Sequence, residues 1–530
     1  MTRALDVAVV GGGPVGLVTA LLLDRQGLEC RVFERSRQPL GLPRAVHLDD
    51  EGLRVLEEVG VGHTVNAEAV PLSGMSLVDP RLEPFVTFER DPTPGPLGFP
   101  ASVMIHQPQV EAHLRAAAWG RGLLQVGSEV TDLIQGPDGV RLTLDVGGRE
   151  VTRLAGRVVG CDGAHSAVRS LAHIADRDLG FRQRWLVMDL VVEREPDHPN
   201  RVLQVCDPRG PATSVPVGRG RHRFEFMIDR GDGPLDVDEL VRAALPRCRR
   251  WLKGVAFNVE RAVPYTFRAR VADRFRDGRV ALAGDAAHEM PPFLGQGLGA
   301  GLRDASSLAW RLGLLAQGRA DERLLDTYED ERQRHVIEVV AVTRRVGRIV
   351  ADRSVLRSGL RRRALAALDG ALRGKGGLSA VKMPPLAPGP LVDAARHGGQ
   401  GGPAGRPLPR PQVRAAGRVE PLDGVLGPGF GVLGIGVDPR IGIPVALRRW
   451  WEDIGARFVA LDTDPRQAAG IESGFDPSGQ MRAWARKHRV ALVVTRPDRI
   501  VLGAYPPPRP DALSPVAELT SRLRAGGLWG

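Results

Sequence analysis

The chain has 530 residues, of which 43% are hydrophobic, so it is long enough for about two to four folded domains with large apolar cores. Its net charge of +11 comes mainly from arginines spread along the chain, and no basic stripe is interleaved with aromatic residues, which argues against a nucleic-acid-binding protein. The sequence shows no signal peptide, no run of roughly 18 uncharged apolar residues and no paired spacing among its cysteines. We therefore expect a cytoplasmic protein with reduced thiols, no membrane span and no bound metal.

An apolar strand, a glycine-rich turn and a helix open the chain. Leu5–Val10 is an apolar run typical of a buried parallel strand, and Leu17–Gln26 is largely apolar and helical. A second strand is predicted at Cys30–Phe33. Strand, turn, helix and strand in this order predict a βαβ unit that binds a dinucleotide.

The turn itself carries three glycines at the spacing GxGxxG. Gly11 permits the tight turn, Gly13 lets the backbone approach a pyrophosphate, and Gly16 allows the helix to pack closely on the strand. Glu34 follows about 20 residues later, where a carboxylate can hold ribose hydroxyls. Glu34 and its neighbour Arg35 are therefore candidate cofactor-binding residues, although they do not indicate a preference between NADH and NADPH.

Two helices and a strand are predicted in the next segment. The helix Asp50–Val59 follows Asp49, which could cap it, and an amphipathic helix begins at Gln107 with a proline at its first position. Arg157–Gly160 is a strand candidate that leads into an Asp-Gly pair at Asp162. An acidic residue thus follows a second predicted strand end.

A run of strand signals, separated by Pro, Gly and Asp turns, comes next. In the last of these strands, alternation puts Phe224 and Phe226 on one face and Arg223 and Glu225 on the other. The pattern does not indicate which face meets a ligand. The predicted strands are Trp185–Val192, Arg201–Cys206, Ala212–Val217 and Arg221–Ile228.

The stretch 279–305 combines a buried strand, a rigid loop and a helix start. Val280–Ala283 reads as the strand, Asp285 follows it, and a double proline precedes a glycine-rich helix start near Leu298. A carboxylate at a strand end beside a rigid loop and a helix N-terminus is typical of a site for a large, flat, polar-edged cofactor.

A segment rich in Pro and Gly, residues 383–412, predicts a linker before a separate C-terminal unit at 413–530. The unit alternates predicted strands and helices. The strands are Gly431–Gly434, Arg457–Leu461, Val490–Thr495 and Ile500–Gly503, and the helices lie around Pro444–Trp451, Gly479–Lys487 and Pro515–Arg524.

The glycine-rich turn, the Asp-Gly pair at Asp162 and the Gly-Asp pair at Asp285 occur in the order and at roughly the spacing of the FAD-dependent aromatic hydroxylases. The chain resembles this family of single-component flavoprotein monooxygenases over about residues 4–385. Within the family it most resembles the 3-(3-hydroxyphenyl)propionate and polyketide hydroxylases. The segments Pro43–Gly60, His106–Ala117 and Arg223–Ile228 carry that match.

This resemblance implies an α/β fold with three domains. A Rossmann-like FAD-binding domain would occupy residues 1–180 and 270–382, with a mixed β-sheet substrate domain, 181–269, inserted into it. The segment 490–503 resembles the terminal hairpin of a thioredoxin-like domain. No cysteine follows Cys248, so this C-terminal domain has no CxxC redox site. The C-terminal domain is therefore expected to have a structural or dimer-forming role, and a homodimer is a possible assembly of the protein.

The resemblance also assigns cofactor contacts. Asp285 would bind the ribityl chain of FAD, Arg44 the pyrophosphate and NAD(P)H, and Gln107 the ribityl or pyrophosphate oxygens. Asp162 would take part in FAD and NAD(P)H binding, with Arg169 as its basic companion. The residues alone also allow simpler roles, namely a turn cap for Asp285, a helix cap for Gln107 and a salt bridge between Asp162 and Arg169.

The helix start near residue 298 would point its N-terminus at the N1–C2=O edge of the flavin. Backbone N–H groups there would stabilise the anionic reduced flavin. Many family members have Asn where this chain has Gly299, so only backbone donors are expected at that position. The candidate residues of this segment are Gly295, Gly297, Leu298 and Gly299.

Residues close to the reacting ring are the hardest to predict. Pro292 and Phe293 are expected on the substrate side of the flavin. His47 and Asp49 could line the same cavity and assist phenol deprotonation, or Asp49 could cap the following helix while His47 packs. Tyr265 could position the substrate ring or lie in the core.

The expected function is that of an NAD(P)H- and FAD-dependent monooxygenase. The resemblance implies hydroxylation of a phenolic aromatic substrate by O₂ through a C4a-hydroperoxyflavin, chemistry that belongs to the cofactor. An epoxidase or a Baeyer–Villiger monooxygenase that tailors a polyketide is the alternative on the same scaffold. A non-catalytic FAD-fold binding protein is a remote third interpretation.

Overall fold

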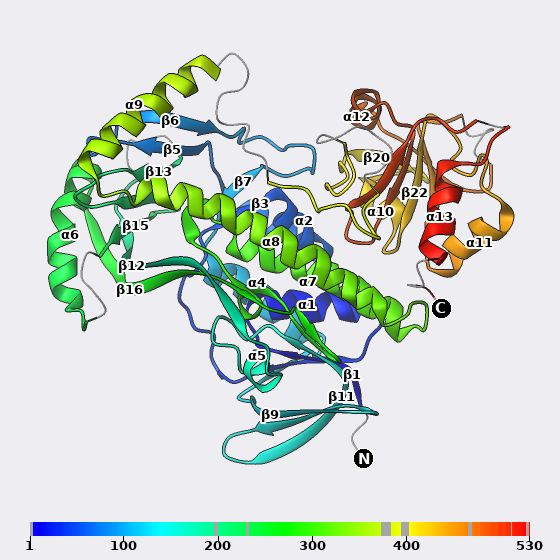
Figure 1. Cartoon of the computed structure of the whole chain (residues 1–530), viewed down its shortest axis with the longest axis horizontal. Coiled ribbons are helices and arrows are strands. Elements are labelled where there is room, and N and C mark those ends of the chain that lie inside the picture. The colour runs from blue at the N-terminus through cyan, green and yellow to red at the C-terminus, as the bar shows by residue number, and fades with distance from the viewer. Residues whose placement is uncertain are drawn as a thin grey trace.

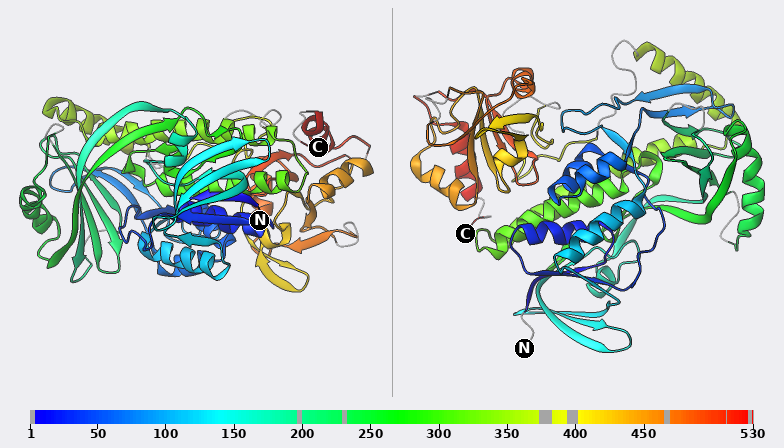
Figure 2. Two further views of the ribbon diagram at one scale, coloured as in Figure 1. Left: turned by 90° about the horizontal axis from the view of Figure 1, so that it is seen from below. Right: turned by 180° about the vertical axis from the view of Figure 1, so that it is seen from behind.

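The structure is a computed structural model of the chain, with three large β-sheets and helices packed between and around them (Figures 1 and 2). It describes residues 4–195, 200–228, 233–372, 383–393, 402–464, 469–509, 511–525 and 529. Two eight-stranded sheets form the larger part, and a seven-stranded sheet of C-terminal strands lies to one side. None of the helices in these ranges is long and apolar enough to cross a membrane.

The first sheet has a parallel core with β1 (Leu5–Val10) in the middle. Five of the six residues of β1 are buried, as expected for a strand that is covered on both faces. Its other strands are β2 (Cys30–Glu34), β8 (Leu124–Val126), β9 (Glu129–Gly136), β10 (Gly139–Asp145), β11 (Glu150–Gly160), β17 (Arg276–Asp277) and β18 (Val280–Leu282). The accompanying helices are α1 (Pro14–Arg25), α4 (Gln107–Gly120), α5 (Ala167–Leu171) and α7 (Gly297–Ala316).

Three strands of this sheet end in register. Val10 of β1 pairs with Gly160 of β11, which in turn pairs with Leu282 of β18. Because these strands are parallel, the loops that follow them leave the sheet at the same edge, where ligands of such sheets bind. The glycine-rich turn, Asp162 and Asp285 therefore lie close together.

The second sheet is mostly antiparallel, in the order β19-β16-β12-β15-β14-β13-β5-β6. Its two longest strands, β12 (Asp176–Val192) and β16 (Phe257–Ala272), run side by side along their length (Figure 1). The helix α6 (Val237–Trp251) covers its outer face. The remaining strands are β5 (Gly74–Val78), β6 (Pro84–Glu89), β13 (Val202–Val205), β14 (Ala212–Gly218), β15 (Arg221–Met227) and β19 (His288–Glu289).

The face of β15 that the sequence left undecided is settled by α6. The rings of Phe224 and Phe226 lie 5.7 and 5.9 Å from the ring of Trp251 on this helix. The alternating residues Arg223 and Glu225 consequently point to the opposite, inner face of the sheet. The polar side of the strand, and not the aromatic side, faces the first sheet.

Two further groups of elements join the sheets. The long helix α8 (Arg323–Val350) crosses the molecule (Figure 1), and the Tyr328 hydroxyl donates to the carbonyl of Leu282 at 2.7 Å, which ties α8 to β18. A small sheet brings β3 next to the start of α7. The elements of this region are α2 (Asp50–Glu58), α3 (Gly62–Glu68), α9 (Val355–Leu372), β3 (His47–Asp49), β4 (Val70–Pro71), β7 (Ser102–Met104), η1 (Gly284–Ala286) and η2 (Pro292–Leu294).

The C-terminal sheet has the order β21-β20-β24-β23-β22-β25-β26. Its core contains Phe430 and Trp451, and the ring of Trp310 from α7 packs 5.6 Å from Phe430. The strands are β20 (Gln412–Ala415), β21 (Arg418–Pro421), β22 (Gly431–Ile435), β23 (Arg457–Leu461), β24 (Glu472–Phe475), β25 (Leu492–Thr495) and β26 (Val501–Tyr505). The helices are α10 (Leu422–Leu426), α11 (Val445–Asp453), α12 (Gln480–His488) and α13 (Pro515–Ala525).

The structure differs from the sequence expectation where strands are polar. The predicted strand Trp185–Val192 is the buried end of the longer β12, whose first half is polar and gives no apolar alternation. Strands β5 and β6 belong to the second sheet although they precede residue 181. In the expected linker, Leu391 and Leu408 are fully buried, whereas residues 394–401 of it and 373–382 before it lie outside the described residues.

Candidate cofactor and substrate site

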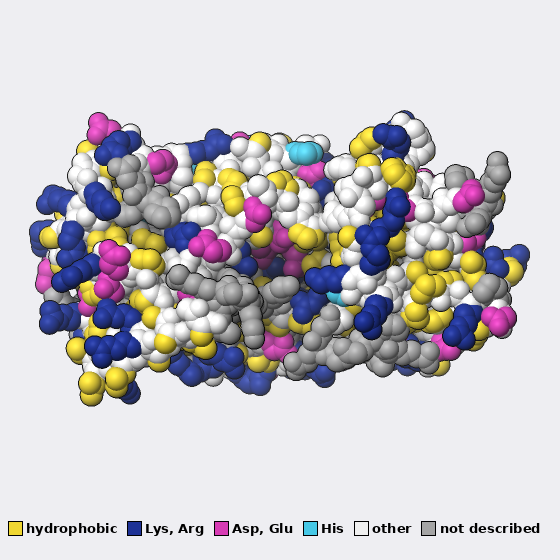
Figure 3. Space-filling view, turned by 90° about the horizontal axis from the view of Figure 1, so that it is seen from above, with side chains coloured by type: hydrophobic (Ala, Val, Ile, Leu, Met, Phe, Trp, Pro, Cys, Tyr) yellow, Lys and Arg dark blue, Asp and Glu magenta, His cyan; other side chains and the backbone are white. Residues whose placement is uncertain are grey.

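A cavity of about 1300 Å³ lies between the ligand-binding edge of the first sheet and the inner face of the second sheet. It runs without interruption from Gly13 at the start of α1, past Asp162 and Asp285, to Pro292 and the inner face of β15. The space-filling view shows a hollow in the middle of one face, with acidic and basic side chains at its rim (Figure 3). The cavity therefore connects all three motifs with the second sheet.

The glycines around the cavity fall into two groups. Gly11 has a φ of +104°, and a Cβ on Gly16 would lie 2.0 Å from the carbonyl oxygen of Gly11, so both are required by packing. A Cβ on Gly13 or Gly297 would meet no atom within 4 Å. These two positions border open space at the starts of α1 and α7, neither of which has a side-chain cap, so both helix ends can receive a ligand.

Glu34 stabilises the glycine-rich turn through backbone hydrogen bonds. Its Oε2 accepts from the backbone N–H of Gly12 at 2.6 Å, and its Oε1 accepts from that of Ser36 at 2.7 Å. Each oxygen keeps a lone pair, so the carboxylate can still accept from a ribose hydroxyl. Arg35 lies on the cavity wall beside it and is highly exposed.

Arg44 lies in an exposed segment that is fastened from two sides. The side-chain oxygen of Gln107 accepts from the N–H of Ala45 at 2.6 Å, and Arg223 donates to the Arg44 carbonyl at 3.0 Å and also to that of Pro43. The Arg44 guanidinium lies on the cavity wall and makes no ion pair with any described residue. It is thus held near the site with its charge available to an anionic ligand.

Asp162 and Arg169 do not pair with each other, so the proposed salt bridge between them is wrong. Asp162 instead supports the start of α5, accepting from the hydroxyl of its N-cap residue Ser166 and from the N–H of Val168. Arg169 donates to the carbonyls of Ala164 at 3.0 Å and Ala286 at 2.8 Å. The arginine therefore links the loop after β11 to the loop after β18.

Asp285 is exposed to the cavity, while protein surrounds it on its other sides. This burial raises the pKa of Asp285 above its ordinary value, opposed by the charges of His288 and Arg44. Behind it, the fully buried Asp304 accepts from His288 at 2.6 Å, from Arg332 at 2.8 Å and from the Gly284 N–H at 3.0 Å. Asp304 thereby fixes the loop that presents Asp285.

The segment before α7 meets the cavity through its backbone. Gly295 (φ +63°), Gly297 and Leu298 line it, and α7 begins at Gly297. Gly299 does not: a Cβ there would lie 3.1 Å from Arg303 and 3.3 Å from Asp49. A side chain at position 299 would therefore approach the ion pair between Arg303 and Asp49, two residues that themselves line the cavity.

His47 is held by hydrogen bonds at both ring nitrogens. Its Nδ1 lies 3.1 Å from the carbonyl oxygen of Gly295, and its Nε2 lies 2.6 Å from the Ser102 hydroxyl. Burial lowers the pKa of His47, so the neutral ring donates from Nδ1 and accepts from Ser102 at Nε2. His47 borders the cavity, but both of its polar atoms are engaged.

Asp49 caps α2 by accepting from the N–H of Gly52 at 2.9 Å. It also pairs with Arg303 of α7, which in turn donates to Glu51 at 2.8 Å. Burial opposes ionisation, but Arg303 holds the pKa of Asp49 below its ordinary value. The capping alternative is the observed geometry, and a charged Asp49 links α2 to α7.

Pro292, Phe293 and Tyr265 all border the cavity, in different ways. The ring of Phe293 is buried and packs edge-on against Trp185 at 5.6 Å and Phe181 at 5.8 Å. Tyr265 is 46% exposed, so it lies in the cavity wall and not in the core. Pro292, whose ring is rigid, borders the cavity beside Phe293 and can contact a ligand there.

Comparisons with known proteins identify the family of this chain. The model of the family described as FAD binding domain matches residues 4–343, and that of the HcaD C-terminal domain matches residues 405–519. The chain is 32% identical to a 3-(3-hydroxy-phenyl)propionate/3-hydroxycinnamic acid hydroxylase of Mycolicibacterium smegmatis, over 99% of this chain and 94% of that protein. This chain belongs to the FAD-dependent aromatic hydroxylases. An Escherichia coli relative with the same name is also 32% identical, over 99% of this chain and 96% of its own length.

Solved structures show the same fold over the whole chain. Aklavinone-11 hydroxylase in complex with FAD and aklavinone is 24% identical, with 99% of both chains covered and a TM-score of 0.77. The anhydrotetracycline hydroxylase OxyS from Streptomyces rimosus is 26% identical, with 98% of this chain and 99% of that chain covered and a TM-score of 0.74. The family match makes this chain an FAD-dependent monooxygenase, a class that uses NAD(P)H as co-substrate.

Several polar residues that this hydroxylase brings to its cavity were not predicted from the sequence. Gln204, Thr213 and Glu225 line it from three neighbouring strands of the second sheet, and Ser102 reaches it from β7. Only Glu225 could have been predicted as a cavity residue, because it lies between two phenylalanines in an alternating strand pattern. The register between strands, which brings the other residues beside it, cannot be read from the strands one at a time.

Proposed function

We propose that this hydroxylase inserts one oxygen atom from O₂ into the ring of a phenolic substrate. The observation that carries the proposal is the single continuous cavity, polar at the glycine-rich turn and largely apolar between Pro292 and the second sheet. Such a cavity can hold a dinucleotide at one end and an aromatic ring at the other. The hydroxyphenylpropionate hydroxylases that resemble the chain over almost their full length support a phenolic substrate.

We propose that FAD occupies the polar part of the cavity. The open space at Gly13 and Gly297, together with two uncapped helix N-termini, suits the pyrophosphate and the flavin edge. Glu34 would accept from the ribose, Asp285 from the ribityl hydroxyls, and Arg44 would meet the pyrophosphate or the nicotinamide nucleotide. When bound and reduced by NAD(P)H, FAD supplies the activation of O₂.

The chain's own contribution would be to orient the substrate and to exclude water. The inner face of the second sheet offers apolar side chains on both sides of a short polar row, and Pro292 gives a rigid contact beside them. Exclusion of water protects a reactive oxygen species from release as peroxide. Residues that line this part of the cavity are Leu77, Val86, Val187, Val202, Val215 and Val263.

The direct test is the absorption spectrum of the purified protein, followed by NAD(P)H oxidation in the presence of 3-(3-hydroxyphenyl)propionate or a polycyclic phenol. We expect bound flavin and a product with one additional oxygen on the ring. The variant Asp285→Asn should bind FAD about tenfold or more weakly, as loss of a charged hydrogen bond predicts, whereas Asp277→Asn in β17, outside the cavity, should not. A colourless protein that takes up no FAD would refute the proposal, and an epoxide or a ring-expanded ester would assign the alternative reaction.

We also propose that the C-terminal unit is a thioredoxin-like domain without a redox role. The strand order β23-β22-β25-β26, with β22 parallel to β23 and antiparallel to β25, supports this assignment. It has no cysteine. The four thiols of the chain, at Cys30, Cys161, Cys206 and Cys248, are all free, which supports a reducing, cytoplasmic compartment. We propose that the protein assembles as a homodimer, and its mass in analytical ultracentrifugation would test this.

A further inference from the structure

The inner face of the second sheet carries one polar row across its strands. Strand register places Gln204 of β13 opposite Thr213 of β14, Thr213 opposite Glu225 of β15, and Glu225 opposite Val187 of β12. Leu77 and Val263 extend the row at its two ends. All six residues line the cavity, so a three-residue polar segment is enclosed between apolar neighbours.

Two members of the row are engaged with each other and with the loop beside the flavin site. The Thr213 hydroxyl donates to the side-chain oxygen of Gln204 at 3.0 Å. The Gln204 amide donates to the carbonyl of Phe293 at 3.2 Å. Strand register also places Thr213 directly beside Glu225, and a hydrogen bond from Thr213 lowers the pKa of the Glu225 carboxyl group.

Glu225 is the ionisable member of the row, and it has no counter-ion among the described residues. It is 7% exposed and makes no ion pair within 4 Å with any residue that the structure describes. The neighbouring cation on the same strand, Arg223, is already engaged by Asp189 at 2.6 Å and by the carbonyls of Pro43 and Arg44. Burying an ionised carboxyl group beside a largely apolar cavity without a counter-ion costs free energy unless a ligand forms a hydrogen bond with it.

Charges around Glu225 leave it poised for proton transfer near neutral pH. Burial raises the pKa of Glu225 to about 7, Arg223 lowers it, and Asp189 across on β12 raises it further. The facing residues on β13 and β14 are the neutral Gln204 and Thr213. A base of this strength is better matched to a phenol than an ordinary glutamate is.

We propose that Glu225 hydrogen-bonds the phenolic hydroxyl of the substrate and accepts its proton. In this step the O–H bond of the phenol breaks, its electron pair stays on the oxygen as phenolate, and a new O–H bond forms on the Glu225 carboxylate. Thr213 and Gln204 are positioning residues, because they connect Glu225 to the Phe293 carbonyl. The inference rests on the proposed phenol hydroxylation.

The same geometry defines the substrate class. The ring must present a neutral hydroxyl to the polar row, because a carboxylate there would lie against the Glu225 carboxyl group. A substrate with an acidic side chain must therefore direct it away from this row. His47 is the competing base, but its two nitrogens are occupied by Gly295 and Ser102.

The test compares Glu225→Gln, Glu225→Asp and the matched control Glu260→Gln, which lies on the same sheet at an exposed position outside the cavity. The measured quantities are FAD affinity, kcat and KM for 3-(3-hydroxyphenyl)propionate from pH 5.5 to 9, and product formed per NAD(P)H consumed. For Glu225→Gln we expect unchanged FAD affinity, a fall in kcat for hydroxylation of about 100-fold or more, and loss of the acidic limb near pH 7. Glu225→Asp should restore part of the rate, and Glu260→Gln should match the wild type.

Each other outcome decides against the assignment. If Glu225→Gln keeps the wild-type kcat and the wild-type pH profile, Glu225 is not the proton acceptor. If it loses FAD affinity and kcat together, its role is structural. If wild-type protein binds FAD but oxygenates no phenol, the proposed function fails first and the Glu225 assignment fails with it.

Discussion

Burial changes the protonation of individual side chains throughout this hydroxylase. His335 on α8 is buried, with Arg332 donating to its Nδ1 at 2.9 Å and its Nε2 lying 3.0 Å from the carbonyl oxygen of Pro384. Burial, and then the charges of Arg332 and Arg303, lower the pKa of His335 to about 3. The ring is therefore neutral in the folded protein at any pH above this value and joins α8 to the segment that follows α9.

His335 gives a prediction about acid stability. The unfolded chain protonates this residue below about pH 6.5, whereas the folded chain does so only near pH 3, so stability is lost as the pH falls from 6.5. The slope is about 1.4 kcal/mol per pH unit, or roughly 2 kcal/mol at pH 5. His335→Gln should remove this part of the loss, measured by urea unfolding at pH 7 and pH 5. The exposed His63→Gln is the control, and equal pH dependence in the wild type and His335→Gln would contradict the argument.

At the scale of elements, the cofactor site depends on how closely α1 approaches the ends of β1 and β11. The Cβ position of Gly16 lies 2.0 Å from the Gly11 carbonyl, and that of Gly11 lies 2.5 Å from the Cys161 carbonyl. Both obstacles are backbone atoms, which cannot rotate away as a side chain can. The contact of helix, turn and strand therefore has no room for any residue larger than glycine.

Gly16→Ala should consequently destabilise the protein, while Gly120→Ala at the end of α4 should not. Overpacking typically costs about 1–3 kcal/mol, and the displaced turn should also weaken FAD binding. A Cβ at Gly120 would meet nothing within 4 Å, and alanine favours a helix over glycine by about 1 kcal/mol. Thermal unfolding with and without added FAD measures both effects. A Gly16→Ala protein with wild-type melting temperature and FAD affinity would show that the turn can move.

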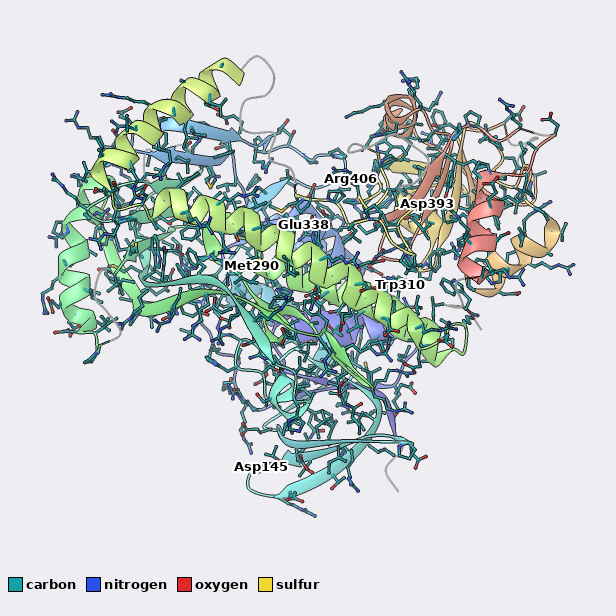
Figure 4. The ribbon with its side chains drawn as sticks, in the orientation of Figure 1. Asp145, Met290, Trp310, Glu338, Asp393 and Arg406 are labelled. Atoms are coloured by element: carbon teal, nitrogen blue, oxygen red, sulfur yellow. The ribbon has the colours of Figure 1, made fainter. Side chains whose placement is uncertain are left out.

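At the scale of the whole molecule, a buried ionic network joins the C-terminal sheet to the FAD-binding part. Arg496, in the turn after β25, is fully buried and donates to Glu331 of α8 at 2.8 Å, as does Arg311 of α7. Arg496 also pairs with Asp498, which accepts from Trp310 at 3.2 Å. Figure 4 shows Trp310 on the side of α7 that faces the C-terminal sheet. The two parts therefore share one rigid polar core.

Arg496→Met should weaken the coupling between the unfolding of the C-terminal sheet and that of the FAD-binding part. It leaves the buried Asp498 without its ion-pair partner, held only by hydrogen bonds from Trp310 and the Ile500 N–H, and loss of one partner from a buried ion pair costs about 3–5 kcal/mol. We expect a lower urea midpoint and a second unfolding transition from the C-terminal sheet. Arg482→Met is the control, because the partners of Arg482, Asp462 and Phe475, both lie in the C-terminal sheet, so its loss should lower the midpoint without adding a second transition. One cooperative transition at the wild-type midpoint in Arg496→Met would argue that the network carries no coupling.

The cofactor half of this protein could be predicted from the sequence by itself, because its requirements are local. The tight turn at Gly11, the close packing at Gly16 and the acidic residues after buried strands each depend on a few consecutive residues. The predicted strand Leu5–Val10 and the helix Asp50–Val59 lie within one residue of β1 and α2 for the same reason.

Only the tertiary structure decided the substrate half. Which face of β15 meets the cavity depended on α6, which covers the phenylalanines, and the polar row at Glu225 depended on the register of four strands. The partners of Arg169 and the neighbours of Gly299 likewise come from elements that are distant along the chain. Contacts of this kind arise from packing between elements, which periodicity within one element does not encode.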